Sequence, residues 1–189
     1  MKTRQWLCGW GLCLALNAHA AFDMDALMTG LSEHPGGHAH FVEKRYAALL
    51  DKPVVSRGEM TYTAPNRLEK RTLEPKAETV ILDGDSLSLE RGQRRMTIQL
   101  SSRPEARAFV DSIRSTLSGN RAALEKNYAM QLSGHSEDWK LVLSPTEPKI
   151  ASLIKRITVS GNGRQIREIE YLQIDDDRTV LQIKPVSQP

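Results

Sequence analysis

The chain has 189 residues, of which 40% are hydrophobic and 26% charged, and its formal net charge is +3. That length suits one domain with a real core. Lys2 and Arg4 lie in a predicted leader, and removing them leaves 24 basic residues against 23 acidic ones. A balance so close to neutral gives little support for nucleic-acid binding, and no later stretch is long and apolar enough to cross a bilayer.

The first twenty residues have the pattern of a secretory signal. A basic start is followed by the apolar run Trp6–Leu16, and Ala18-His19-Ala20 places small residues where signal peptidase cleaves. This order predicts a signal peptide over residues 1–20, cleaved after Ala20, and a single mature domain over residues 21–189 in the periplasm. The apolar run is too short to span a membrane comfortably, and the alternative is an amphipathic or buried first helix.

Both cysteines lie inside this leader. Cys8 and Cys13 follow Leu7 and Leu12, whereas the acylated cysteine of a bacterial lipoprotein follows a small residue. The sequence therefore predicts a mature chain with no lipid anchor and no disulfide.

The mature chain is expected to open with a helix and a long strand. Phe22–Ser32 places its large apolar residues on one helical stripe. Glu33–Gly37 then combines a proline with two glycines, which ends the helix. His38–Leu50 is typical of a first strand, with Phe41, Val42 and Tyr46 as its large residues.

The segment Gly58–Pro75 has the clearest strand pattern. It alternates Met60, Tyr62 and Ala64 with polar residues, breaks at Pro65-Asn66, and resumes over Arg67–Leu73. Period-two alternation around a turn predicts an antiparallel hairpin. One face of the hairpin is apolar, so either this chain or a ligand must cover it.

Further short strands follow, separated by turn signals such as Gly84-Asp85, Gly161-Asn162-Gly163 and Asp175-Asp176-Asp177. They are predicted over Thr79–Asp83, Ser86–Glu90, Arg94–Leu100, Tyr128–Leu132, Trp139–Leu143, Ile154–Ser160, Gln165–Ile174 and Thr179–Lys184. Short strands at regular spacing favour a barrel or sandwich over a parallel α/β sheet. The total is about eleven strands and three helices.

The pattern changes to helical after Pro104. Glu105–Leu117 is predicted to be a helix, and a short helix over Arg121–Lys126 follows. The first has one apolar stripe, made of Ala106, Phe109, Val110, Ile113 and Leu117. We predict that this helix lies across the open mouth of the barrel as a lid, with Phe109 and Ile113 lining a cargo cavity. The alternative is an ordinary core helix.

A search for catalytic motifs finds no nucleophile–base pattern, P-loop or zinc motif in the mature sequence. We therefore expect a protein that is not an enzyme and has no cofactor. His38 and His40 share a strand face, as two metal ligands do, but exposed residues of an edge strand are the favoured interpretation. The triple Asp175-Asp176-Asp177 is interpreted as a hairpin turn rather than a calcium site.

The apolar residues offer a binding function. A strongly curved sheet buries its concave face by packing helices into it or by holding a ligand there. Met60, Met96 and Met130 occupy alternating strand positions, and the flexible methionine side chain suits an irregular apolar guest. A fully packed core explains the same methionines equally well, so both interpretations stand at this point.

The order of these features resembles one family. HAHFVEKR, SRGEMTYTAPNRL, LDGDSL, the segment Trp139–Pro145 and the strand Ile166–Ile174 with its acidic turn resemble the LolA-like periplasmic lipoprotein carriers. The resemblance covers essentially the whole mature chain. Single motifs such as G-x-x-x-Y-x-x-P-x-x-L are moderately specific, and their order is more so.

The resemblance implies a mainly β (α+β) fold, an open antiparallel half-barrel of about eleven strands closed by helices. It also implies a carrier that shields acyl chains of lipoproteins or related lipids in an apolar cavity. Cargo would come from an inner-membrane transporter and pass to an outer-membrane acceptor, with no nucleic-acid partner, and the carrier would be a monomer. We expect the cavity to be lined by Met60, Tyr62, Leu68, Leu82, Met96, Ile98, Phe109, Val110, Ile113, Leu117, Met130, Trp139 and Leu141.

Two departures from the family pattern indicate a divergent member. Ala64 stands before the proline of the second strand, where well-studied carriers have an arginine that helps hold the lid closed. The strand Arg67–Leu73 is also more charged than its usual aromatic version. The alternatives are therefore a carrier for a dedicated exporter of lipids or polyene-like acyl products, and a lipid-sensing or protein-interaction module of the same fold that binds through a sheet edge.

Overall fold

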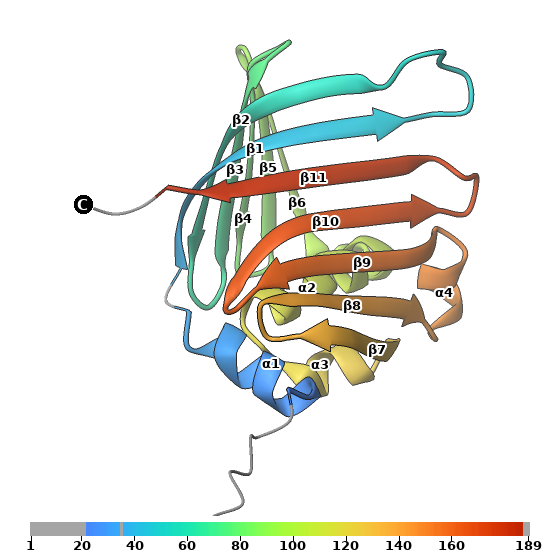
Figure 1. Cartoon of the computed structure of the whole chain (residues 1–189). Helices are drawn as coiled ribbons and strands as arrows, with labels where there is room; N and C mark the ends of the chain where they lie inside the picture. Colours follow the sequence, from blue (N-terminus) through green and yellow to red (C-terminus); the bar gives the residue numbers. More distant parts are fainter. Residues whose placement is uncertain (1–21, 35, 187–189) are drawn as a thin grey trace, which may run out of the picture.

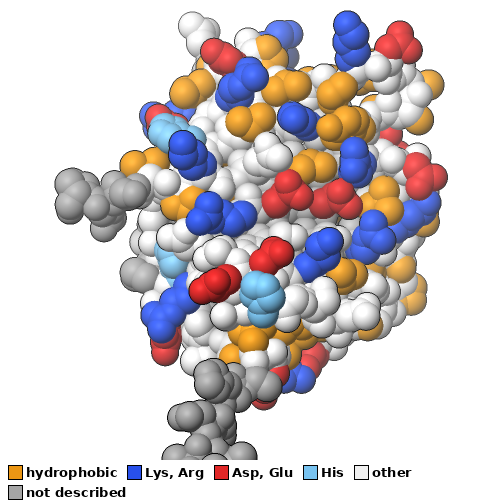
Figure 2. Space-filling model, in the orientation of Figure 1, with side chains coloured by type: hydrophobic (Ala, Val, Ile, Leu, Met, Phe, Trp, Pro, Cys, Tyr) orange, Lys and Arg blue, Asp and Glu red, His pale blue; other side chains and the backbone are white. Residues whose placement is uncertain are grey.

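The computed structural model describes residues 22–34 and 36–186, and the signal peptide predicted for residues 1–20 lies outside this range. Its main feature is an antiparallel sheet of 11 strands, which curves strongly around its helices (Figure 1). The strands are β1 (Gly36–Tyr46), β2 (Val54–Thr63), β3 (Arg67–Glu74), β4 (Glu78–Asp83), β5 (Ser86–Arg91), β6 (Arg94–Gln99), β7 (Tyr128–His135), β8 (Asp138–Pro145), β9 (Ile154–Asn162), β10 (Gln165–Gln173) and β11 (Arg178–Pro185). The predicted mainly β, open antiparallel half-barrel is confirmed. Basic and acidic side chains are mixed over the face of the molecule seen in Figure 2.

Short helices cover and connect the strands. They are α1 (Met24–Ser32), the 3-10 helix η1 (Leu100–Ser102), α2 (Pro104–Leu117), α3 (Arg121–Glu125) and α4 (Pro148–Ala151). The three predicted helices correspond to α1, α2 and α3, with ends within two residues. The sequence does not predict η1 and α4, because segments this short show no helical period. None of the helices within the described ranges is long and apolar enough to cross a membrane.

The order of strands in the sheet explains why it stays open. From edge to edge it is β6-β5-β4-β3-β2-β1-β11-β10-β9-β8-β7, so the chain starts in the middle and winds out to β6. It then crosses through η1, α2 and α3 to β7 at the opposite edge, and winds back to β11 beside β1. The crossing segment therefore lies between the two edges of the sheet, against its concave face (Figure 1).

The first strand is shorter than predicted at its C-terminal end. β1 stops at Tyr46, whereas the prediction extended to Leu50. A turn follows, in which the Leu50 amide donates to the Ala47 carbonyl (2.9 Å) and the Ala48 amide donates to the Asp177 carboxylate (3.2 Å). These bonds replace ladder bonds, so the alternating pattern continues for four residues beyond the strand that it predicts.

Gly58 lies inside β2, not at its start as the hairpin pattern predicts. A Cβ atom at this position would lie 1.9 Å from the Arg71 carbonyl oxygen and 2.9 Å from the Phe41 ring. The register between β2 and β3 shifts between Arg57 and Gly58, and such a bulge bends and twists a strand. Gly58 thus lets the sheet bend while the buried ring of Phe41 covers its backbone.

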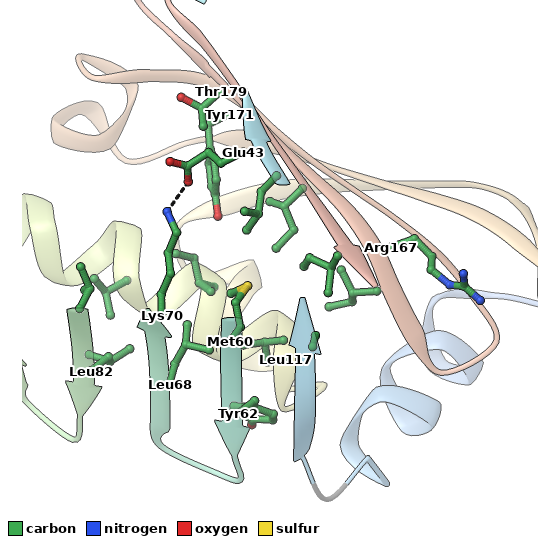
Figure 3. Close-up of a pocket in the computed structure, with 18 of the residues that line it drawn as sticks. Glu43, Met60, Tyr62, Leu68, Lys70, Leu82, Leu117, Arg167, Tyr171 and Thr179 are labelled. Carbon is green, nitrogen blue, oxygen red and sulfur yellow. Dashed lines mark hydrogen bonds and ion pairs between the residues drawn. The ribbon is translucent and has the colours of Figure 1, made fainter. Parts of the chain in front are cut away.

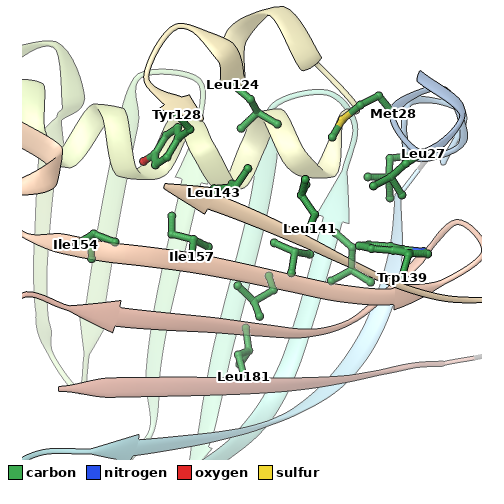
Figure 4. Close-up of a cluster of buried hydrophobic side chains, with 14 of the residues drawn as sticks. Leu27, Met28, Leu124, Tyr128, Trp139, Leu141, Leu143, Ile154, Ile157 and Leu181 are labelled. Carbon is green, nitrogen blue, oxygen red and sulfur yellow. The ribbon is translucent and has the colours of Figure 1, made fainter. Parts of the chain in front are cut away.

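The main core lies where the sheet from β7 to β11 meets α1 and α3 (Figure 4). Leu27 and Met28 of α1 and Leu124 of α3 are buried against Trp139 and Leu141 of β8. The indole Nε1 of Trp139 donates to the Gly163 carbonyl at 2.9 Å. A buried indole with its one donor satisfied contributes packing without leaving a polar group unpaired.

Replacing Trp139 with alanine should lower the free energy of unfolding by about 3–5 kcal/mol, because it empties the centre of this core. Urea unfolding followed by circular dichroism measures the change. Met96→Ala is the control, since Met96 is 53% exposed and its loss should change stability by less than about 0.5 kcal/mol. Equal effects of the two substitutions would contradict this assignment of the core.

Candidate functional site

A cavity of about 1240 Å³ lies between the concave face of the sheet and α2 (Figure 3). Strands β1 to β5, β10 and β11 supply most of its wall, and α2 supplies the opposite side. Its apolar lining includes Met60, Leu68, Val80, Leu82, Leu87, Phe109, Val110, Ile113, Leu117, Ile169, Leu181 and Ile183. Aliphatic side chains therefore dominate the surface that a guest would contact.

Strand register explains how distant segments form one apolar wall. Tyr62 pairs with Leu68, Leu68 with Leu82, and Leu82 with Leu87, so one row of side chains crosses β2, β3, β4 and β5. Directly paired residues of antiparallel strands point to the same side of the sheet. The alternation seen in the sequence thus becomes a continuous lining.

Helix α2 contacts both halves of the sheet. Val110 packs in a cluster with Leu82 of β4 and Leu100 of η1. On the other half, the Phe109 ring lies 5.1 Å from the Tyr171 ring of β10, tilted by 59°. The helix therefore bridges the cavity from β4 to β10, and its apolar stripe faces the enclosed space.

A tether from α2 to the β4–β5 turn holds the helix in place. Arg114 donates from Nη2 to the Gly84 carbonyl at 2.7 Å. The adjacent Asp85 accepts from the amides of Leu100 (2.8 Å, to its carbonyl) and Ser101 (3.2 Å, to its carboxylate), and the hydrogen bonds from Ser101 hold the pKa of the Asp85 carboxyl below its usual value. The arginine of this contact therefore lies on the helix, and its acceptor lies in the turn between β4 and β5.

Eight of the predicted site residues line the cavity. They are Met60, Tyr62, Leu68, Leu82, Phe109, Val110, Ile113 and Leu117. The strand residues among them alternate along β2, β3 and β4, and the helical ones form the stripe of α2. The cavity is thus built from the two segments whose periodicity is clearest in the sequence.

Met96 and Ile98 do not line it, contrary to the prediction. They pair with Leu89 and Leu87 across β5 and β6, so they lie on the expected face of the sheet. β6 is the edge strand, however, and Met96 is 53% exposed. Lying on the concave face is therefore not sufficient for a residue to line the cavity, because the cavity wall ends before the edge of the sheet.

Met130, Trp139 and Leu141 are a second correction. Register places them on the same face, but they belong to the core under α1 and α3: Trp139 and Leu141 are fully buried and Met130 packs against them. Alternation in the sequence identifies which face of the sheet a residue lies on, but not what covers that face. Of the two interpretations, the packed core applies to β7 and β8, and the cavity applies to β2 to β5.

The cavity also has polar residues that the sequence analysis missed. Lys70 of β3 forms an ion pair with Glu43 of β1 (Figure 3), and its Nζ lies 4.9 Å from the centroid of the Phe41 ring. Burial raises the pKa of the Tyr171 hydroxyl well above its usual value, and the nearby Glu43 charge raises it further. The alternation Glu43-Arg45 and Leu68-Lys70 in the sequence marks these positions as inward-facing once the register is known.

The two candidate metal sites have other roles in the structure. His38 and His40 are exposed, but β1 is a central strand and not an edge strand as predicted. The His38 Nδ1 lies 2.9 Å from the Thr61 hydroxyl. The aspartates at 175–177 form the predicted turn between β10 and β11, with the Asp177 amide donating to the Asp175 carboxylate (3.1 Å). Within the described ranges, no three or more His, Cys, Asp or Glu side chains form a group able to hold a metal ion.

Comparisons with known proteins give one family and several weakly similar solved structures. A family model described as "Outer membrane lipoprotein carrier protein LolA-like" matches residues 16–183. A LolA superfamily protein from Nitrosomonas europaea is similar over 88% of this chain and 93% of that chain, with 9% identity and a TM-score of 0.43. MucB in complex with MucA(peri) is similar over 88% of this chain and 55% of that chain (14% identity, TM-score 0.44). LprF from Mycobacterium bovis is similar over 88% and 93%, respectively (10% identity, TM-score 0.38). A comparison with curated proteins finds no significant match.

Replacing Arg114 with leucine should lower the free energy of unfolding by about 1–3 kcal/mol, because the helix loses a charged hydrogen bond and leaves the Gly84 carbonyl unpaired. Urea unfolding measures it. Arg107→Leu is the matched control on the same helix. The one ion pair of Arg107 among the described residues is with Asp111 (3.5 Å) on an exposed surface, and its loss should cost about 0.5 kcal/mol or less. Equal costs would show that Arg114 does not tether α2.

Proposed function

Because the chain belongs to the LolA-like family of outer membrane lipoprotein carrier proteins, we propose that it binds acyl chains of lipoproteins or related lipids and shields them from water in transit. The observation that carries the proposal is the cavity of about 1240 Å³ with its mainly aliphatic lining. Ligand pockets for small molecules are typically about 300–1,000 Å³, so this one suits a long chain.

The energy for such binding comes from burial of methylene groups. Each one taken from water contributes about 0.8 kcal/mol, so a chain of about twelve methylenes gains roughly 10 kcal/mol before the cost of association. That gain suffices to hold a chain and still permits release to a site that buries it better. The function is binding and transfer, without a chemical step.

The proposed pathway runs through the periplasm. The chain is exported by its signal peptide, receives cargo from an inner-membrane transporter and passes it to an outer-membrane acceptor. A dedicated exporter of lipids or polyene-like acyl products would use the same cavity in the same way. The scheme needs one copy of the chain, and we propose that the carrier is a monomer.

A second candidate is a lipid-sensing or protein-interaction module of the same fold. The observation that favours it is the open sheet, which ends in the edge strands β6 and β7. Edge strands offer unpaired backbone groups to an added strand. Native mass spectrometry of the protein purified from a bacterial periplasm separates the two: co-purified lipid supports the carrier, and a lipid-free protein holding a peptide supports the second candidate.

Replacing Phe109 with glutamate should abolish binding of a fluorescent fatty acid while the protein stays folded. Phe109 lines the cavity and is half-buried, so a carboxylate there is close to the guest chain but not enclosed in a packed core. Melting temperature and binding are measured together. Met96→Glu is the matched control, because it places the same charge on the concave face of the sheet but outside the cavity. This variant should bind the fluorescent fatty acid normally. Unfolding of Phe109→Glu, or normal binding by it, would contradict the role of α2 as a lid.

The mature protein should begin at Ala21 and remain in solution without detergent. The intact mass of the protein after periplasmic extraction gives the N-terminal residue. Sedimentation at high speed tests whether the protein stays in solution. A chain that retains Met1 would contradict export through a cleaved signal peptide.

A further inference from the structure

Two hydrogen-bond donors extend into the cavity from opposite walls. Lys70 comes from β3 and Tyr171 from β10 (Figure 3), and both belong to the lining. The Glu43 carboxylate links them, since it pairs with Lys70 and its charge acts on the Tyr171 hydroxyl. A polar cluster of three residues from separate strands therefore interrupts the aliphatic wall.

The Lys70 ammonium group has more hydrogen-bond donors than its pairing with Glu43 uses. An ammonium group carries three N–H donors, and the one carboxylate that pairs with Lys70 among the described residues is that of Glu43. The Phe41 ring covers another side at 4.9 Å. Lys70 belongs to the cavity lining, so its remaining donors are available to an acceptor on a guest.

A tyrosine hydroxyl can donate one hydrogen bond to an acceptor on the guest, and Tyr171 belongs to the cavity lining. Because burial and the Glu43 charge raise its pKa, the hydroxyl stays protonated at any physiological pH. An anionic oxygen that reaches this point meets two donors, one of which carries a full positive charge.

The charge of the lining also favours an anion. Arg45, Lys70, Arg164, Arg167 and Lys184 contribute to it, whereas Glu43 is the one acidic residue among its described members. Arg45 and Arg164 have partners outside the lining, Asp177 at 3.6 Å and Glu33 at 2.7 Å. Arg167 and Lys184 form no ion pair within residues 22–34 and 36–186. Arg45, Arg164, Arg167 and Lys184 are exposed, so they place positive charge at the rim of the cavity, where it attracts an anion toward Lys70.

A guest without a polar head should bind weakly beside the Glu43–Lys70 pair. Covering the Glu43–Lys70 pair with hydrocarbon removes water from two charges, and that desolvation opposes binding. A carboxylate head instead replaces the lost water with charge-assisted hydrogen bonds. The same wall thus disfavours plain hydrocarbon and favours an ionic head.

We propose that the cavity holds a single-chain amphiphile by its carboxylate head, which accepts hydrogen bonds from Lys70 and Tyr171 while the acyl chain lies along α2. This inference rests on the proposed acyl-binding function and names its class of cargo. Lys70 and Tyr171 are binding residues in this scheme, and Glu43 positions the lysine.

The test compares three ligands with the same chain: dodecanoate, dodecanol and dodecyltrimethylammonium. Each displaces the uncharged probe N-phenyl-1-naphthylamine from the full mature chain at pH 8, where the acid is ionised. We expect dodecanoate to bind roughly tenfold or more tightly than dodecanol, as a charge-assisted hydrogen bond predicts. Dodecyltrimethylammonium should bind most weakly of the three.

The variants remove the polar cluster without leaving a charge unpaired. In the double variant Glu43→Gln/Lys70→Met the preference for the acid over the alcohol should fall to about twofold or less, and Tyr171→Phe should reduce it about threefold. Lys140→Met is the control, because Lys140 is exposed and lies outside the cavity lining, and it should preserve the preference. Melting temperatures confirm that each variant is folded. The alcohol provides an internal check, because its binding should not weaken when the desolvation cost of the ion pair is removed.

The outcomes separate this inference from the proposed function. Equal affinity of the acid and the alcohol for the unmodified protein overturns the carboxylate subsite and leaves acyl binding intact. Tighter binding of the ammonium ligand also overturns it, since Glu43 would then receive the head. Displacement of the probe by none of the three overturns both. A preference for the acid that persists in the double variant assigns it to another group and overturns the role of Lys70.

Discussion

The constraint on which this structure depends is that one sheet has too much concave surface for its own helices to fill. A meander of 11 antiparallel strands has its crossing segment between the two edges, so that segment must pass over the concave face. Helix α1 and the short α3 fill the side near β7 to β9 with a packed core. Helix α2 alone spans the rest, and a cavity of about 1240 Å³ remains beneath it.

The position of α2 follows from contacts at both of its flanks. Val110 packs against β4 and η1, Phe109 contacts Tyr171 of β10, and Arg114 reaches the β4–β5 turn. The apolar stripe packs against both core clusters through Ala106, Phe109, Val110 and Leu117, and the same stripe lines the cavity. Helix α2 is therefore at once part of the core and the cover of the cavity.

Much of the fold was predictable from the sequence, because alternation and turn residues are local signals. The hairpin around Pro65-Asn66 and the stripe of α2 place Met60, Tyr62, Phe109 and Ile113 correctly at the cavity. Trp139 and Leu141 show the same alternation yet lie in the core, since what covers a strand depends on helices distant in sequence. The Glu43–Lys70 pair was missed for a related reason. These residues are 27 positions apart on strands that β2 separates, so no local pattern in the sequence connects them.

The pairing of β1 with β11 has a consequence for how the cavity forms. Every other neighbouring pair in the sheet joins consecutive strands, so each half of the sheet is held by contacts of short sequence separation. β1 and β11 join positions such as Tyr46 and Arg178, across almost the whole domain, and closing so long a loop costs more entropy than any local hairpin does. Long-range contacts of this kind slow folding. The two meanders are therefore expected to form first and to meet along this seam last, so a newly made chain has two half-walls, and no enclosed cavity, until the seam closes.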